Sequence, residues 1–252
     1  MEAGVGNPVF DSVRPWLERL PSGAWPTLEA LNALAEETQV RTASGMPVRF
    51  VRPSPADPYY EVHVHETGCV ATRAENWHDL FNALIWLAYP RTKAKINALH
   101  AKEIPLEGGR RGRLRDLLTI FDEGGAIVAC ADAGLRQMIL DFRWKELFWE
   151  QRNRVVSGLR FIVLGHAVLE KALEPWPGIT CKALFIGIDE DPDENAAQWL
   201  AAHASDGSPH LLAPLPVFGY PGWLPESASA DFYLDERYFR PFREKIRIGG
   251  KE

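Results

Sequence analysis

The sequence has 252 residues, of which 46% are hydrophobic and 25% are charged, and this is ample material for a globular core. The formal net charge of -6 argues against broad, sequence-independent binding to nucleic acids. The longest apolar runs are too short to span a bilayer, and the N-terminus carries no secretory signal. With three dispersed cysteines that form no paired motif, these features predict a cytoplasmic protein that does not enter a membrane. No linker divides the chain, so we expect a single domain over residues 1–252.

The first part of the chain mixes short helices and short strands. Residues 7–40 have apolar positions at helical spacing and predict two helices, the second one capped by Thr27. Residues 48–52 and 59–65 alternate between apolar and polar side chains, which predicts two half-buried strands. Residues 69–72 follow a glycine and are expected to pair back as a hairpin.

The most apolar stretch of the chain spans residues 76–90. It begins at Asn76, a residue that commonly caps helices, and ends at Pro90, so we expect a helix that is buried on nearly all sides. Asp79 completes a near match to a capping box. Thr92 is expected to cap a second helix that continues to about residue 102.

Later elements are predicted in the same way. Residues 117–130 read as two strands around a glycine-containing turn, and residues 133–152 as one or two helices. Residues 159–173 form a second apolar stretch and predict a second buried helix. A strand is expected over residues 181–187, followed by a helix from Asp191 to about residue 203.

Prolines are frequent after residue 203 and preclude long regular elements there, although the tail keeps many aromatic and aliphatic side chains. We therefore expect an ordered Pro-rich C-terminal coil. Together these elements predict an α+β fold, in which a small mixed or antiparallel sheet is packed by the two apolar helices.

His166 and Glu170 lie four residues apart on the second predicted apolar helix, so their side chains should share one face. An ionisable pair on an otherwise apolar helix loses hydration energy and needs partners. The pair therefore indicates a polar pocket, with either a bound metal or a buried hydrogen bond. His78, at the start of the first apolar helix, remains a site candidate if His166 and Glu170 come to meet it. Neighbouring helix residues point about 100° apart, so Asp79 is better explained as a helix cap than as a second ligand.

Other polar residues offer weaker candidates. Lys93, Asn97 and His100 share one helix face, which is either solvated or able to contact an anionic substrate. Asp122 and Glu123 sit at the predicted hairpin turn, where acidic residues are common without any function.

Two further clusters of polar residues each have a functional and a structural interpretation. His63 and His65 alternate on a predicted strand and either chelate a metal or face solvent from an edge strand. The basic segment 110–115 could dock an anionic partner, although a solvated loop explains it equally. The signature motifs of P-loop nucleotide-binding proteins, Rossmann dehydrogenases, α/β-hydrolases and zincin proteases are absent.

Four blocks of sequence resemble the bacterial family known as domain of unknown function 3025, and the resemblance extends from about Trp16 to Arg243. The blocks are Asn76-Trp77-His78-Asp79-Leu80-Phe81-Asn82-Ala83-Leu84 with Tyr89-Pro90 and Lys93, then Leu118-Thr119-x-Phe121-Asp122-Glu123-x-Gly125, then Gly165-His166-Ala167-x-x-Glu170-Lys171, and finally Pro214-Leu215-Pro216-Val217-x-Gly219-x-Pro221-Gly222-Trp223. The resemblance implies one continuous bacterial domain and no assigned activity. By analogy, the polar residues inside the blocks are expected to converge on one pocket, whereas His63 and His65 lie outside the pattern.

Two hypotheses follow. The first is an enzyme, hydrolytic in class and assisted by a divalent metal that activates water. Its catalytic residues would be His78, Glu123, His166 and Glu170; its substrate-binding residues Asn82, Lys93, Asn97 and His100; and its metal ligands His78, His166, Glu170 and Asp122. The second is a non-catalytic protein that binds a small molecule or a protein, in which the same side chains form a structural network and the Trp/Pro-rich tail, including Tyr220–Trp223, is the contact surface.

Overall fold

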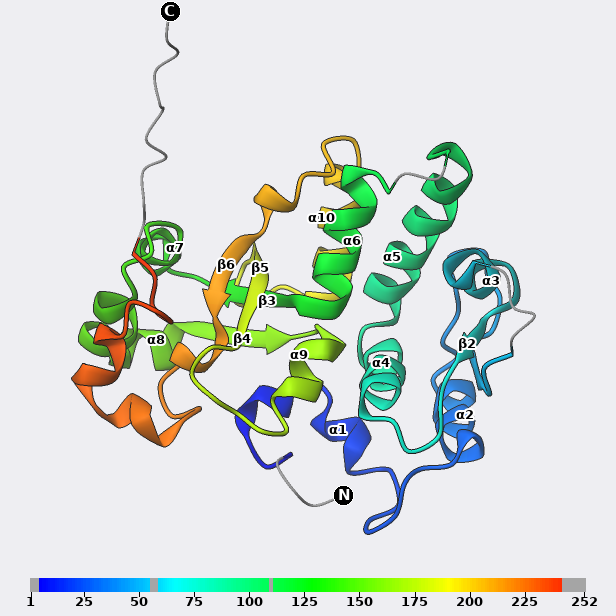
Figure 1. Cartoon of the computed structure of the whole chain (residues 1–252), viewed down its shortest axis with the longest axis horizontal. Helices are drawn as coiled ribbons and strands as arrows, with labels where there is room; N and C mark the ends of the chain where they lie inside the picture. Colours follow the sequence, from blue (N-terminus) through cyan, green and yellow to red (C-terminus); the bar gives the residue numbers. More distant parts are fainter. Residues whose placement is uncertain (1–4, 55–58, 109–110, 242–252) are drawn as a thin grey trace, which may run out of the picture.

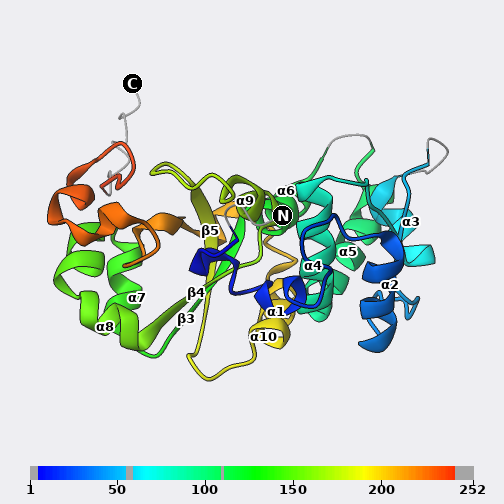
Figure 2. The same ribbon diagram turned by 90° about the horizontal axis from the view of Figure 1, so that it is seen from below.

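The computed structural model describes residues 5–54, 59–108 and 111–241. A four-stranded sheet lies in the middle of the molecule, with a cluster of helices at one side and short helices plus the C-terminal segments at the other (Figure 1). Figure 2, seen from below, shows the same order along the long axis. The helices are α1 Arg14–Leu17, α2 Leu28–Glu37, α3 Tyr60–Thr67, α4 Trp77–Ala88, α5 Pro90–Glu103, α6 Arg113–Gly124, α7 Ala133–Leu140, α8 Arg152–Gly158, α9 His166–Lys171 and α10 Pro192–His203.

The central sheet is mixed, as predicted. Its strand order is β4-β3-β5-β6, with β3 antiparallel to β4, β3 parallel to β5, and β5 antiparallel to β6. The strands are β3 Gly125–Cys130, β4 Leu159–Val163, β5 Thr180–Ile186 and β6 Ala213–Pro216. A second, two-stranded sheet pairs β1 (Arg49–Val51) in parallel with β2 (Cys69–Ala71). The α+β prediction is therefore confirmed.

Helix α4 is the predicted apolar helix of residues 76–90. Its Asn76 side chain accepts a hydrogen bond from the Asp79 backbone N–H at 2.9 Å, which confirms the N-cap. Phe81, Leu84 and Trp86 are almost fully buried, so α4 packs into the core on several sides. Among the described residues, no helix is long and apolar enough to cross a membrane.

The N-cap predicted at Thr92 is wrong. Helix α5 begins earlier, at Pro90, where a missing backbone N–H is harmless because the first helical donors have no partner in the helix. Thr92 instead contacts α10: its N–H donates to Oδ1 of Asp193 at 2.7 Å and its hydroxyl donates to the Asp193 carbonyl at 3.0 Å. Thr92 therefore holds two helices together.

The strand predicted over residues 59–65 is wrong, because this segment forms α3. Val64 is fully buried, and Gly68 ends the helix in a left-handed conformation with φ 75°. His63 and His65 are two residues apart on a helix and point about 200° away from each other, so they cannot chelate as strand neighbours would. The segment after Gly68 pairs in parallel with β1 instead of forming a hairpin.

The hairpin predicted over residues 117–130 is also wrong. Leu117, Leu118 and Phe121 form one buried stripe of α6, and β3 begins directly after the helix. Gly125 marks the change, because a Cβ atom there would lie 2.1 Å from the Phe121 carbonyl oxygen. The adjacent glycines therefore end a helix rather than turn a hairpin.

The second predicted apolar helix, residues 159–173, is in fact a strand and a short helix. Exposure alternates along β4, with Leu159, Phe161 and Val163 buried. The chain then turns at Gly165 into α9. This break gives α9 a fixed position beside α4 and α6.

The Pro-rich tail is ordered, as predicted, through several 3₁₀ turns and the edge strand β6. Trp223, which the binding hypothesis places on the contact surface of this tail, is only 7% exposed. The Trp223 ring packs edge-on against Phe161, with 6.0 Å between the ring centroids. Trp223 is therefore part of the core.

Candidate functional site

Helices α4 and α9 bring together three side chains that we call the histidine array: Glu170, His78 and His166. Nδ1 of His78 lies 3.0 Å from Oε2 of Glu170. On the other side of the same ring, Nε2 of His78 lies 3.0 Å from Nε2 of His166. The two imidazoles meet edge to face, with 4.4 Å between centroids and 83° between planes. His78 therefore contacts both His166 and Glu170. This contact is the condition under which the sequence made His78 a candidate site residue.

Solvent exposure decreases along the array. The side chain of Glu170 is 42% exposed, that of His78 is 33% exposed, and that of His166 is only 6% exposed. Nδ1 of His166 is buried and has no hydrogen-bond partner among the described residues. The Oδ2 atom of Asp122 lies 3.9 Å from it, and the Asp122 backbone is close enough to raise the pKa of the ring against the effect of burial. One buried, unpaired nitrogen therefore ends a chain of contacts that begins at the surface.

The protonation of His166 follows from its burial. Loss of hydration lowers the pKa of His166 to about 4, and the nearby Asp122 carboxylate only partly opposes this effect. The ring is therefore neutral near pH 7 and carries one proton. If Nε2 of His166 donates that proton, Nε2 of His78 accepts it and Nδ1 of His78 donates to Glu170. Every contact then pairs a donor with an acceptor, and a lone pair remains on Nδ1 of His166.

Lys93 and Asp122 form a buried ion pair next to the array. Nζ of Lys93 lies 2.5 Å from Oδ1 of Asp122 and 2.8 Å from Oδ1 of Asn82. It also lies 5.5 Å from the centroid of the Trp86 ring, within cation–π range. Burial alone would raise the pKa of Asp122, but Lys93 and His166 outweigh it, so the pKa of this carboxyl is lowered.

The predicted polar face of α5 exists but is not solvated, since Lys93, Asn97 and His100 are at most 5% exposed. The Asn97 amide donates to Oε2 of Glu61 at 2.7 Å, and burial raises the pKa of Glu61. Nε of Arg115 donates to Nδ1 of His100 at 3.4 Å. Burial lowers the pKa of His100 to about 4. These side chains connect α3, α5 and α6 inside the protein.

Asp79 lies outside the array and pairs with Arg73. Its carboxylate accepts from the Arg73 backbone N–H at 2.7 Å and from the guanidinium nitrogens at 2.8 Å. Burial would raise the pKa of Asp79, but the bonds from Arg73 lower it. The interpretation of Asp79 as part of a helix terminus therefore fits better than a ligand role.

The basic segment 110–115 offers few free charges. Arg111 pairs with Asp116, Arg113 with Asp206, and Arg115 with Glu107, at 3.1, 3.6 and 2.8 Å. Arg110 lies outside the described residues. The described arginines are thus already paired with carboxylates, and the expected loop is wrong for Arg113 and Arg115, which lie in the first turn of α6.

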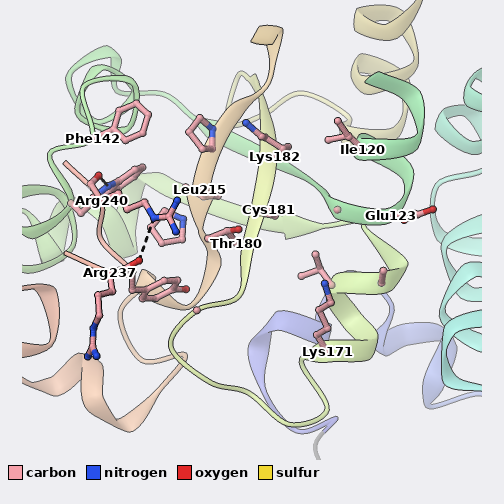
Figure 3. Close-up of a pocket in the computed structure, with 18 residues that line it drawn as sticks. Ile120, Glu123, Phe142, Lys171, Thr180, Cys181, Lys182, Leu215, Arg237 and Arg240 are labelled. Carbon is pink, nitrogen blue, oxygen red and sulfur yellow. Dashed lines mark hydrogen bonds between the residues drawn. The ribbon is translucent and has the colours of Figure 1, made fainter. Parts of the chain in front are cut away.

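Glu123 does not join the array. It is an exposed residue at the end of α6 and lines a cavity over β5 and β6, where its carboxylate points away from the strands (Figure 3). No sequence pattern predicted this cavity. Its one local signal is Lys182, a charged residue within a strand that is otherwise largely buried.

The predicted metal ligands come together as a chain of contacts rather than around one point. Glu170 contacts Nδ1 of His78, and Asp122 lies near Nδ1 of His166, so both carboxylates face the outer nitrogens of the rings. Within the part of the chain that the structure describes, no group of three or more His, Cys, Asp or Glu side chains is arranged to hold a metal ion. The Glu170 carboxylate is placed to orient His78, whereas Asp122 is too far from Nδ1 of His166 for a direct hydrogen bond.

Gly165 sets the distance between α9 and α6. A Cβ atom at this position would lie 2.6 to 2.7 Å from the backbone of Glu123, Gly124 and Gly125. We expect Gly165→Ala to push α9 away and to lower the free energy of unfolding by about 1–3 kcal/mol. Urea denaturation measures this change.

Gly158→Ala is the matched control, since a Cβ atom at Gly158 meets nothing within 4 Å. Gly158 ends helix α8, so alanine there should be neutral or stabilise by up to about 1 kcal/mol. Equal stabilities for the two variants would contradict the close packing of α9 on α6.

Comparisons with known proteins give one match. A family model described as "Protein of unknown function (DUF3025)" matches residues 48–243. Neither the curated proteins nor the solved structures contain a significant match. The matched region includes all three residues of the histidine array.

Proposed function

The chain belongs to the family described as a protein of unknown function (DUF3025). This description names no activity, and we propose that the chain is an enzyme of the hydrolytic class. Its general base is Nδ1 of His166. His78 and Glu170 carry the accepted proton to solvent.

The observation that carries this proposal is the 3.0 Å contact between Nε2 of His78 and Nε2 of His166. Nδ1 of His166 accepts a proton from a water molecule, and Nε2 of His166 releases its proton to Nε2 of His78. Nδ1 of His78 then releases its proton to the Glu170 carboxylate. One proton enters at the buried end and one arrives at the exposed end, so no ring gains net charge.

Asp122 supports the same chemistry. Its Oδ2 lies 3.9 Å from Nδ1 of His166, a separation that one water molecule would bridge with two hydrogen bonds of about 2.8 Å once the site opens, because Nδ1 is buried in the present conformation. Lys93 holds this carboxylate in place from the other side. Such a water is oriented for attack while its proton faces Nδ1.

The test is hydrolysis of chromogenic ester, amide and phosphoester substrates by the purified chain. We expect His166→Asn to lower kcat by about 10²- to 10⁴-fold, and Glu170→Gln to lower it less, because solvent can replace the final acceptor. His210→Asn is the matched control, since His210 is exposed on a 3₁₀ turn. Thermal melting verifies that each variant is folded.

Two outcomes would overturn the proposal. The first is hydrolysis that is equally fast in the wild-type protein and in folded His166→Asn. The second is a stoichiometric metal in the wild-type protein that is lost in His166→Asn, with activity restored only by adding the metal; the predicted metal-assisted reaction would then replace the proton relay.

A further inference from the structure

A cavity of about 440 Å³ lies over β5 and β6 on the sheet side of α6 and α9. Figure 3 shows it spanning from Lys171 on α9, across Thr180 and Lys182 on β5, to Phe142 and Arg240. The array residues His78, His166 and Glu170 are not among those that line it. The cavity is therefore a second place in the molecule where a ligand can bind.

The charged groups that line this cavity are mostly cationic. The side-chain amines of Lys171 and Lys182 make no hydrogen bond or ion pair with another described residue, whereas the Arg237 guanidinium forms an ion pair with Asp235 at 2.9 Å. Glu123 is the one acidic residue among the described residues of the lining, and its carboxylate points away from the strands. Although the chain has a net charge of -6, this local excess of positive charge favours the binding of an anion.

Among the residues that line the cavity, Lys182 is the one whose charged form would gain most from a nearby anion. It is half-buried on β5, and burial lowers its pKa. An amine that loses water contacts without gaining a counter-ion is destabilised in its charged form. A bound anion would restore the favourable environment of that charge.

The part of the cavity next to Lys182 is apolar. Pro214 and Leu215 on β6, which pair with Lys182 and Cys181 of β5, line it together with the partly buried Phe142. Phe142 has φ 60° because it ends α7 in a left-handed cap, in which its N–H donates to the Ile139 carbonyl at 3.2 Å and the Arg143 N–H donates to the Met138 carbonyl at 2.9 Å. This cap fixes the backbone of Phe142 at the edge of the cavity.

We propose that this cavity binds a small organic anion whose flat apolar part packs against Phe142 and whose phosphate or carboxylate group contacts Lys182. Lys171 and Arg240 add positive charge at the two ends of the cavity. This proposal is independent of the histidine array, because its test measures binding and uses no enzymatic activity.

The experiment is calorimetric titration of the full chain with phenyl phosphate, benzoate and phenol at low salt. We expect at least one of the two anions to bind, and phenol, which lacks the charge, to bind at least about tenfold more weakly. The stronger of the two anions identifies which acidic group the cavity prefers. Lys182→Gln should lower the affinity for that anion about tenfold.

Lys102→Gln is the matched control, since Lys102 is an exposed lysine on α5 that does not line the cavity; it should leave the affinity unchanged. Three results would overturn the proposal: neither anion binds, phenol binds as well as the anions do, or Lys182→Gln and Lys102→Gln bind the anion equally. Both variants change exposed or half-buried charges, and their melting temperatures verify that they are folded.

Discussion

Lys93→Met is expected to lower the free energy of unfolding by about 3–5 kcal/mol, the largest effect of any single substitution proposed for this protein. Methionine keeps most of the apolar stem but removes the ammonium that lies 2.5 Å from Oδ1 of Asp122. The carboxylate is then left in the interior without its cation, beside the neutral His166. Urea denaturation at neutral pH measures the loss.

The double variant Lys93→Met/Asp122→Leu separates loss of the pair from loss of volume. Removing both charges should recover much of the stability, because a buried ion pair replaced by apolar groups is often close to neutral. Lys102→Met, on the exposed face of α5, should change stability by less than about 0.5 kcal/mol. A loss below about 1 kcal/mol in Lys93→Met would show that the pair is screened by solvent and is not buried.

Acidification is expected to produce the second large effect, a loss of stability between about pH 6.5 and pH 4. The folded-state pKa values of His100 and His166 are lowered to about 4 from 6.5. At these two sites the unfolded chain therefore binds more protons than the native chain in this window, so both histidines make stability rise with pH, while the raised pKa values of Glu61 and Asp193 act in the opposite direction. Each histidine contributes about 3 kcal/mol to the change. The lowered pKa values of Asp79 and Asp122 add a further loss at lower pH.

Urea denaturation at a series of pH values measures this dependence. His100→Asn should flatten the curve between about pH 6.5 and pH 4 by roughly half, because one of the two buried imidazoles no longer titrates. The exposed His210→Asn should follow the wild-type curve. A wild-type protein that is equally stable at both ends of the window would contradict the burial of both rings.

The sequence predicts the elements whose signals are local. The caps of α4 and α10 lie where Asn76 and Asp191 predict them, because capping depends on one side chain and the next turn. The errors at residues 117–130 and 159–173 have one cause. A short apolar run fits a strand or a buried helix equally, and which one forms depends on packing with distant segments.

The candidate site also contains contacts that local spacing predicts and contacts that it does not. The four-residue spacing of His166 and Glu170 places both side chains beside α4, where His78 contacts each of them. The pair of Lys93 with Asp122 joins residues of two different helices, α5 and α6, and no local pattern predicts which helices will pack together. The cavity with Lys182 is missed for the same reason, since its walls come from six separate parts of the chain.

Nitrogen-15 NMR of the histidine side chains tests the central claim, the shared proton between His78 and His166, most directly. The proton relay predicts that at neutral pH His166 is protonated at Nε2 and bare at Nδ1, and that His78 is protonated at Nδ1. It also predicts a scalar coupling across the hydrogen bond between the two Nε2 atoms. This coupling should weaken or disappear in Glu170→Gln, because loss of the carboxylate changes the tautomer of His78. Two doubly protonated rings, or a proton on Nδ1 of His166 without coupling between the rings, would contradict the relay.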